Sequence, residues 1–393
     1  MVLHFVFSYE VKQMIYFDNG ATSFPKPRGM SAEMEDCILN YCGNPGRSGH
    51  YMSMKTGEKV YEARKSIARI FNIKDPGRLT FTKNTTEALN AGLIGFLKEG
   101  DHVVTTSMEH NSVLRPLKQL EEAGVSHTIV KGDEEGFVSA ESVRSAITEA
   151  TRLIVVTGAS NVTGTIMPIE QIGRLAARNN IPLMLDAAQC GGCMPIDVEK
   201  CNISMLAFPG HKGLLGPLGT GALYVAPGVE IKPLICGGTG TESRSRVQPF
   251  DFPEGYESGT INAPGIIGLG YSARFIEKVG IQTIEFYERE LIRRFDDRIR
   301  NMDFVDMYGP VPAGKTGISL FNIRNVECEE VTALLNRDYG IAVRGGYHCA
   351  GLAHKTIGTW ETGAVRLSVG PFNTRREIDR AVDAVWKIGK KMQ

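Results

Sequence analysis

A lysine stands in a glycine-rich turn directly after an apolar run. The run covers 203–208, and residues 209–213 read Pro-Gly-His-Lys-Gly, with the lysine at Lys212. The run predicts a short buried strand, and the Pro-Gly pair predicts the turn that ends it. Burial lowers the pKa of a lysine and frees its neutral amine, which can form a Schiff base with a carbonyl compound. A solvated surface lysine is the alternative that this stretch leaves open.

Pyridoxal phosphate is the commonest such carbonyl compound, and it needs a phosphate cup and an acid for its ring nitrogen. Thr85 and Thr86 follow a short predicted strand and open a helix, where free N–H groups and hydroxyls could bind a phosphate. Asp186 ends an apolar run and could pair with the pyridinium, while Gln189 could donate to the ring's phenolic oxygen. Simple capping of a helix, or metal binding by Asp186, are the alternatives.

Two further side chains could act on a bound ring or its substrate. His110 follows a predicted strand and could stack on a flat ring while handling protons, or it could simply cap a loop. Arg366 interrupts an apolar strand, where a guanidinium needs an anion. That anion could be a substrate carboxylate held by two hydrogen bonds, or a partner in a structural salt bridge.

Strands and helices are predicted to alternate from residue 53 to about residue 225. Strands are expected at 78–83, 103–106, 127–130, 153–156, 182–185, 203–208 and 221–225. This alternation predicts an α/β domain with a largely parallel sheet, whose ligand lies beyond the carboxyl ends of the strands. The candidate polar residues fall at those ends: Thr85, Thr86, His110, Asn161, Asp186, Gln189, His211 and Lys212.

The pattern changes after Thr260 and predicts a smaller α+β domain. Helices are expected at 281–302 and 329–337, strands at 317–323, 341–343 and 365–369, and a last helix opening with the capping box of Thr374 and Glu377. We expect an N-terminal arm at 1–24 that packs with the small domain, a large domain at 25–265 and the small domain at 266–393.

Composition excludes several classes of partner. The chain has 393 residues, with 44 basic and 44 acidic side chains, and no tract approaches a membrane span. Nucleic acid and membrane are therefore not expected partners. The eight cysteines are scattered, and residues 1–13 fit a signal peptide poorly, so we expect reduced thiols in the cytoplasm. Cys190 and Cys193 lack a second C-x-x-C pair and are expected to be buried hydrophobic residues, with no metal site.

Together these residues resemble the class V aminotransferase family of fold-type-I pyridoxal phosphate enzymes, and within it the cysteine desulfurases. The matching motifs follow the family's order and occupy residues 16–22, 84–90, 109–110, 160–164, 186–189, 210–213, 257–260, 344–350, 366–368 and 372–374. The resemblance implies a large domain with a mostly parallel seven-stranded sheet flanked by helices, a smaller α+β C-terminal domain, and a homodimer.

Cys349 distinguishes the reaction within that family. It lies in the sequence Arg-Gly-Gly-Tyr-His-Cys at 344–349, and a desulfurase needs an activated, partly exposed thiol on a glycine-flanked segment. The short segment resembles that of Suf-type (group II) desulfurases. The resemblance implies that L-cysteine is converted to L-alanine, that the sulfur becomes a persulfide on Cys349, and that an acceptor protein then takes the sulfur.

The resemblance also assigns the remaining roles. Phosphate contacts fall to residues of three segments, namely Thr85, Thr86, His211 and, from the neighbouring subunit, Thr260. His110 would stack on the ring, Asn161 and Gln189 would meet the phenolate or the substrate, and Arg366 would take the substrate carboxylate. Arg344 would lie near the substrate or the cysteine. The family usually has a phosphate-donating Ser or Thr at the position of Pro209, and its loss would weaken phosphate binding by about 1–2 kcal/mol.

Other activities remain open at this point. A selenocysteine lyase would use L-selenocysteine, because selenium leaves carbon more readily and needs no cysteine thiol. An aminotransferase or another pyridoxal phosphate lyase would share the fold and the cofactor. A non-enzymatic sulfur-transfer scaffold would have kept the fold alone.

Overall fold

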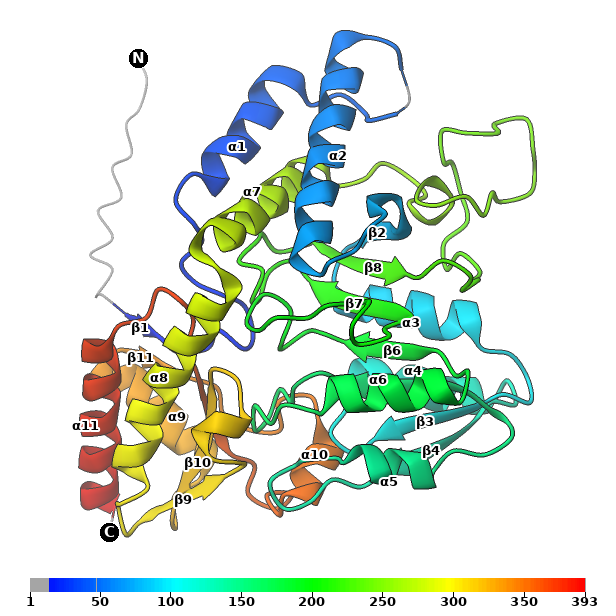
Figure 1. Cartoon of the computed structure of the whole chain (residues 1–393). Helices are drawn as coiled ribbons and strands as arrows, with labels where there is room; N and C mark the ends of the chain where they lie inside the picture. Colours follow the sequence, from blue (N-terminus) through cyan, green and yellow to red (C-terminus); the bar gives the residue numbers. More distant parts are fainter. Residues whose placement is uncertain (1–13, 47, 393) are drawn as a thin grey trace, which may run out of the picture.

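A seven-stranded sheet forms the centre of the larger part of the molecule (Figure 1). The computed structural model describes residues 14–46 and 48–392. The strand order is β2-β8-β7-β6-β5-β3-β4. The strands are β2 (Leu79–Thr82), β3 (His102–Thr106), β4 (Ser126–Val130), β5 (Thr151–Thr157), β6 (Leu183–Asp186), β7 (Met205–Pro209) and β8 (Gly221–Val225). The predicted α/β class with a mainly parallel sheet is confirmed.

One strand departs from the parallel pattern. β8 pairs antiparallel with both β7 and β2, whereas the pairs among β3, β4, β5, β6 and β7 are all parallel. A parallel crossover needs a dozen or more residues and usually a helix. Residues 210–220 form a glycine-rich turn with no helix, so the chain returns beside β7 in the opposite direction.

Helices cover both faces of the sheet and bury alternate residues of each strand. One face packs against α2 (Tyr51–Ile70), α5 (Ala140–Ser145), α6 (Ile169–Arg178) and α7 (Ala263–Val279); the other packs against α3 (Thr85–Phe96) and α4 (Asn111–Glu121). Leu183 and Leu185 of β6 pack in the core on the first of these faces, and Met184 packs in the core on the opposite face. This period of two buries β6 completely and delivers Asp186 to its carboxyl end.

A second core lies beside the sheet, in the lower left of Figure 1. Its strands are β9 (Val305–Tyr308), β10 (Ile318–Ile323) and β12 (Val365–Ser368) in an antiparallel sheet, and β1 (Ile15–Tyr16) paired in parallel with β11 (Ile341–Ala342). Its helices are α8 (Ile281–Ile299), α9 (Cys328–Tyr339) and α11 (Arg375–Met392), whereas Ala353 of α10 (Gly351–Thr356) packs in the core of the central sheet. Thr374 and Glu377 form the expected capping box at the start of α11.

Several elements differ from the sequence prediction. The sequence pattern did not predict α1 (Met30–Asp36), the following π-helix (Cys37–Tyr41), β9, α10 or α7. Glycines argue against α7 by propensity. The small size of these glycines explains why they occur in this helix. A Cβ added to Gly270 would lie 2.5 Å from the Cβ of Ala63, so glycine lets α7 pack closely on α2.

The packing of α7 bears on the domain division. Its buried apolar residues, from Ala263 to Ile276, belong to the same hydrophobic core as α2 and the central sheet. After Gly280 the chain bends, and α8 runs toward the small domain (Figure 1). We therefore propose that the large domain extends to Val279 instead of ending at residue 265. The N-terminal arm runs from β1, whose partner β11 lies in the small domain, toward the central sheet. Residues 1–13 of this arm lie outside the described residues.

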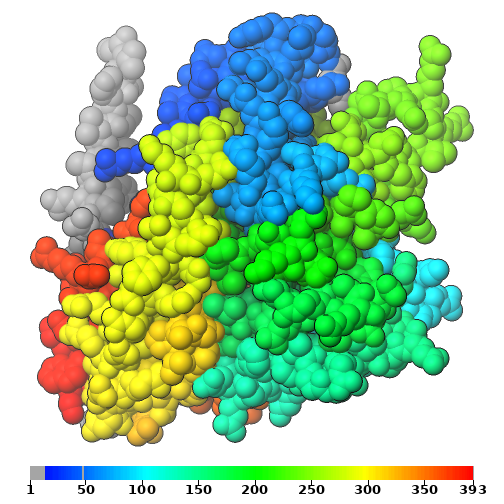
Figure 2. Space-filling model, viewed as in Figure 1, coloured from blue at the N-terminus to red at the C-terminus, as the bar shows by residue number. Residues whose placement is uncertain are grey.

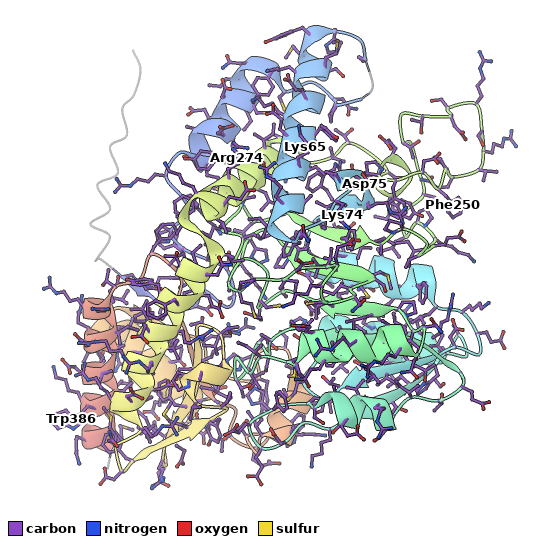
Figure 3. The ribbon with its side chains drawn as sticks, in the orientation of Figure 1. Lys65, Lys74, Asp75, Phe250, Arg274 and Trp386 are labelled. Carbon is purple, nitrogen blue, oxygen red and sulfur yellow. The ribbon has the colours of Figure 1, made fainter. Side chains whose placement is uncertain are left out.

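The surface shows one protruding segment. Residues 236–250 stand out from the body of the molecule in Figures 1 and 2, and Figure 3 labels Phe250 at the end of this segment. Val247 and Phe250 are exposed there. Within the described part of the chain, no helix is both long and apolar enough to span a bilayer.

A buried ion pair lies within the small domain, beside the loop that follows β5. The Nζ of Lys315 lies 2.6 Å from an Asp296 carboxylate oxygen, both side chains are at most 1% exposed, and Ser319 donates to the other oxygen at 2.6 Å. The Lys315 backbone forms a β-bridge with Thr165. Removing one partner of such a pair leaves a buried charge without compensation.

We expect Lys315→Met to lower the free energy of unfolding by about 3–5 kcal/mol for this reason. Urea unfolding of the variant and the parent chain measures the difference. Lys74→Met is the matched control, since Lys74 (Figure 3) forms an exposed pair with Glu199 and its loss should leave the midpoint unchanged. A Lys315→Met protein as stable as the parent would contradict the prediction.

Candidate active site

A pocket opens at the carboxyl ends of the central strands. It brings together the eight residues predicted at those ends, namely Thr85, Thr86, His110, Asn161, Asp186, Gln189, His211 and Lys212. It is completed by residues that were not predicted to take part: Asn84, Leu89, Ser112, Thr157 and Ala188. The pocket therefore lies where the alternation of strands and helices placed it.

The N-terminus of α3 forms one end of the pocket. The Asn84 side chain caps this helix by accepting from the backbone N–H of Glu87 at 3.0 Å. The hydroxyls of Thr86 and Ser112 lie 2.8 Å apart. Thr85 Oγ1 is buried and has no hydrogen-bond partner among residues 14–46 and 48–392. A buried hydroxyl without a partner and a helix N-terminus together suit an anion such as a phosphate.

Asp186 lies at the base of the pocket, at the end of β6. One of its oxygens accepts from the backbone N–H of Ala188 at 2.9 Å. Burial raises the pKa of this carboxyl to about 6, against the opposing effects of that N–H and of the Lys212 charge. A cationic partner such as a protonated pyridine would restore the ionised form.

His110 has a capping role, as the N-cap of α4, and it also lines the pocket. Its Nδ1 accepts from the backbone N–H of Ser112 at 3.0 Å. Burial, and then the positive charge of Lys212, lower the pKa of His110 to about 4. The ring is therefore neutral near pH 7, and its proton belongs on Nε2.

His211 and Lys212 follow β7 in a turn that the N-terminal arm holds. The carbonyl of His211 accepts from the backbone N–H of Ser23 at 2.9 Å and from Lys26 Nζ at 2.9 Å. His211 Nδ1 is buried with no partner in the described ranges, and burial lowers the pKa of its ring to about 4. Burial and then the Arg366 charge lower the pKa of Lys212 to about 8, while Asp186 acts in the opposite direction.

We expect the pH dependence of cofactor capture to follow this Lys212 pKa of about 8. Only the neutral amine attacks an aldehyde, so the rate at which the apoenzyme binds pyridoxal phosphate covalently should rise about tenfold per pH unit below pH 8 and then level off. Stopped-flow absorbance measures this rate. Nα-acetyl-lysine is the control, because its rate should keep rising to about pH 10. A protein profile that matches this control would contradict the lowered pKa.

Arg366, on β12, is 1% exposed; it does not line the pocket but contacts the pocket residue Asn161. Its Nη2 donates to Asp18 at 3.0 Å and its Nη1 to the Asn161 carbonyl at 2.8 Å. The structural salt bridge considered for this residue is therefore present. Its Nε is buried without a partner among the described residues, which leaves one donor for another anion. Gly20 packs on the guanidinium, since a Cβ there would lie 3.0 Å from Arg366 Cζ.

Cys349 lies on an exposed turn before α10. Arg344 Nη2 lies 3.8 Å from its sulfur. The turn is fastened to the large domain, because Asn161 donates to the His348 carbonyl at 2.5 Å and the Asn111 N–H donates to the Cys349 carbonyl at 2.9 Å. Asn161, in the cofactor pocket, thus touches the turn that carries the thiol.

Three further residues that the sequence singled out have the following positions in the single chain. Gln189 donates its amide to the Gly20 carbonyl at 2.9 Å, although it also lines the pocket. Thr260 is exposed and does not line the pocket; its hydroxyl accepts from Asn44 at 3.4 Å. Pro209 ends β7 opposite Gly221, is buried in the sheet, and does not line the pocket.

Sequence reasoning missed three contributors, of which Ser112 and Thr157 had detectable signals. Ser112 follows His110 by two residues, the spacing at which a capping residue meets the first turn of a helix. Asp18 lies in a quoted motif but received no role, because its partner Arg366 stands at the other end of the chain. Thr157 is the last residue of β5, and this position at the carboxyl end of a strand could have indicated that it lines the pocket.

Pyridoxal phosphate fits the residues of this pocket. The two buried groups without partners, Thr85 Oγ1 and His211 Nδ1, and the N-terminus of α3 suit its phosphate. Asp186 suits its ring nitrogen, and Lys212 suits its aldehyde. Cys190 is fully buried and Cys193 partly so, and the described residues hold no group of three metal-ligating side chains.

Known proteins resemble the chain over nearly its whole length. The family described as "Aminotransferase class-V" matches residues 15–381. A "Probable cysteine desulfurase" of Methanothermobacter thermautotrophicus is 38% identical, over 94% of this chain and 93% of that protein. "Cysteine desulfurase IscS" of Clostridium botulinum is 34% identical, over 97% and 96%. The solved apo cysteine desulfurase of Thermococcus onnurineus NA1 superposes with a TM-score of 0.90 at 34% identity, covering 96% of this chain and 95% of that one.

Proposed function

The chain belongs to the aminotransferase class-V family, and on this premise we propose that it is a cysteine desulfurase dependent on pyridoxal phosphate. The reaction converts L-cysteine to L-alanine and leaves the sulfur as a persulfide on Cys349. One observation carries the proposal beyond the family: an exposed thiol stands beside a guanidinium, on a turn that the pocket residue Asn161 contacts. An aminotransferase requires no such thiol.

The cofactor is pyridoxal 5'-phosphate, which when bound supplies an electron-accepting ring conjugated to the substrate Cα. We propose that Thr85, Thr86, Ser112 and His211 hold its phosphate. The carboxylate of Asp186 keeps the ring nitrogen protonated. His110, neutral and fixed at Nδ1 by the Ser112 N–H, would stack on the ring and donate from its Nε2–H.

Arg366 and Lys212 position the substrate and move its proton. Arg366 binds the substrate carboxylate through the Nε that lacks a partner among the described residues, while Asp18 and the Asn161 carbonyl fix the guanidinium plane. Lys212 would hold the cofactor through its aldehyde until the substrate amine takes that place. Its amine, with a pKa lowered to about 8, then takes the Cα proton.

Cys349 accepts the sulfur as a thiolate beside Arg344. Its sulfur attacks the substrate sulfur, a new S–S bond forms and the substrate C–S bond breaks. The electron pair of that bond stays with carbon, which takes a proton, so that one L-cysteine and one thiol become one L-alanine and one persulfide. A reductant or an acceptor thiol then removes the persulfide sulfur.

Product analysis tests the proposal directly. The holoenzyme is incubated with L-cysteine, and L-alanine is measured together with sulfide, with and without dithiothreitol. We expect equal amounts of alanine and sulfide with the reductant, and about one alanine and one persulfide per site without it. Keto-acid-dependent amino transfer without sulfide would instead identify an aminotransferase. Faster alanine release from L-selenocysteine that survives loss of Cys349 would identify a selenocysteine lyase.

We also propose a cytoplasmic homodimer that passes sulfur to an acceptor protein. Thr260 is exposed and distant from its own pocket, which suits a contact with the phosphate of the neighbouring subunit. Exposed apolar side chains gather on the π-helix and α2 beside it, among them Ile38, Leu39, Met52 and Met54. The eight free cysteines suit a reducing compartment. Sedimentation velocity tests the dimer.

A further inference from the structure

Two histidines and a threonine form a hydrogen-bonded row behind Cys349. His348 Nδ1 lies 3.2 Å from His354 Nε2, and His354 Nδ1 lies 2.7 Å from Thr359 Oγ1. At the other end, His348 Nε2 lies 3.2 Å from the Arg344 carbonyl oxygen. All three side chains are at most 3% exposed, and none lines the cofactor pocket.

Elementary bonding rules fix the direction of every hydrogen bond in this row. A carbonyl oxygen only accepts, so His348 Nε2 carries a proton and donates to Arg344. Burial lowers the pKa of His354 to about 4 and that of His348 well below its ordinary value, so both rings are neutral. His348 Nδ1 must then accept from His354 Nε2–H, and His354 Nδ1 must accept from the Thr359 hydroxyl.

The row supports a turn that the backbone alone disfavours. His348 and Cys349 have φ values of 53° and 58°, consecutive left-handed conformations in residues that are not glycine. Each such residue costs about 1–3 kcal/mol and persists only where the surroundings hold it. Asn161 and Asn111 hold the two carbonyls of the turn. Of the two side chains of this turn, only that of His348 is buried, and its hydrogen bond to His354 holds it in place.

The row also fixes the residue that faces the thiol. The Arg344 carbonyl accepts from His348 Nε2 and from the backbone N–H of Arg366 at 2.8 Å. These two bonds fix the backbone from which the guanidinium reaches Cys349, 3.8 Å from its sulfur. The His348 side chain thus links both ends of the segment 344–349.

We propose that His348, His354 and Thr359 are positioning residues that hold Cys349 and Arg344 in the geometry in which the thiol accepts sulfur. This inference rests on the proposed function, because it names what prepares the thiol for that reaction. None of the three residues lines the cofactor pocket. Their loss should therefore slow sulfur transfer and leave the earlier steps unchanged.

Variants of His354 test this separation. His354→Leu removes the donor to His348, whereas His354→Gln keeps an amide N–H that can replace it. After mixing holoenzyme with L-cysteine, we expect the first cofactor absorbance change at the wild-type rate in both variants. Persulfide formation on Cys349, followed by rapid quenching and mass spectrometry, should be about tenfold slower in His354→Leu and within about twofold of wild type in His354→Gln. The steady-state KM for L-cysteine should stay unchanged.

Amide hydrogen exchange of the apoenzyme gives a readout independent of turnover. We expect the amides of residues 344–350 to exchange at least tenfold faster in His354→Leu, and at the wild-type rate in His354→Gln. Thr359→Val and Thr359→Ser form a second matched pair, to be judged in the same way if His354→Leu does not fold.

Two results would overturn the inference. One is a folded His354→Leu or Thr359→Val protein with wild-type persulfide and exchange rates. The other is a folded His354→Gln protein as slow as His354→Leu. Wild-type enzyme that forms neither alanine nor persulfide would refute the proposed function instead, and the exchange measurement would still decide whether the row holds the turn.

Discussion

Cys349→Ala should abolish persulfide formation and lower L-alanine production from L-cysteine at least a thousandfold, or about 4 kcal/mol in activation free energy. The substrate sulfur then has no thiolate to attack it, since no other residue of the described segment 344–350 carries a nucleophilic sulfur. The visible spectrum of the cofactor and its change on adding L-cysteine should persist, because Lys212 and Arg366 are untouched. Mass spectrometry of the intact protein, with amino-acid analysis, measures both products.

Cys236→Ala is the matched control for this prediction. Cys236 is also an exposed free thiol, but it lies at the start of the protruding segment 236–250, outside the cofactor pocket. Its loss should leave alanine and persulfide at wild-type levels. Undiminished sulfur release by Cys349→Ala would show that another group accepts the sulfur and would remove the basis for the desulfurase proposal.

Lys212→Ala should lower turnover by about 10³–10⁴-fold, because it removes both the covalent anchor of the cofactor and the base for the Cα proton. Pyridoxal phosphate should still bind through the residues around Thr85, His211 and Asp186. Borohydride should fix the cofactor to the Lys212 peptide of the wild-type protein and to no peptide of the variant. Peptide mapping by mass spectrometry detects this difference.

Small amines separate lost chemistry from lost structure in this variant. Methylamine should raise the turnover of Lys212→Ala at least tenfold, because a diffusing amine can replace the missing base. Lys65→Ala is the control, since Lys65 (Figure 3) lies on α2 over the Tyr61 ring and does not line the pocket. Wild-type turnover by Lys212→Ala would exclude this lysine as the cofactor's anchor.

Local sequence patterns predict the sheet and the pocket well, for a common reason. A short apolar run such as 182–185, followed by a polar residue such as Asp186, encodes both the strand and the end at which its functional side chain lies. Parallel strands then bring Asp186 and Lys212 to one edge of the sheet. Periodicity alone therefore indicates where the eight polar residues meet.

Contacts between distant segments are not encoded in local patterns. Asp18 gives no sign that its partner is Arg366, and the glycines of α7 lower its helix propensity while permitting its close packing on α2. The sequence likewise gives no sign of a role for His354, which is one polar residue of a short helix. Its importance depends on a neighbouring ring, His348, whose left-handed backbone only the folded structure reveals.

The ion pair between Asp18 and Arg366 has a consequence for synthesis of the chain. Its two residues are 348 positions apart. A ribosome delivers Asp18 early and Arg366 near the end, so long-range contacts of this kind form last. The pocket residues from Thr85 to Lys212 emerge well before the thiol-bearing turn. A chain that ends between Lys212 and Cys349 therefore carries every pocket residue but lacks both the arginine proposed to orient the substrate and the thiol proposed to take its sulfur.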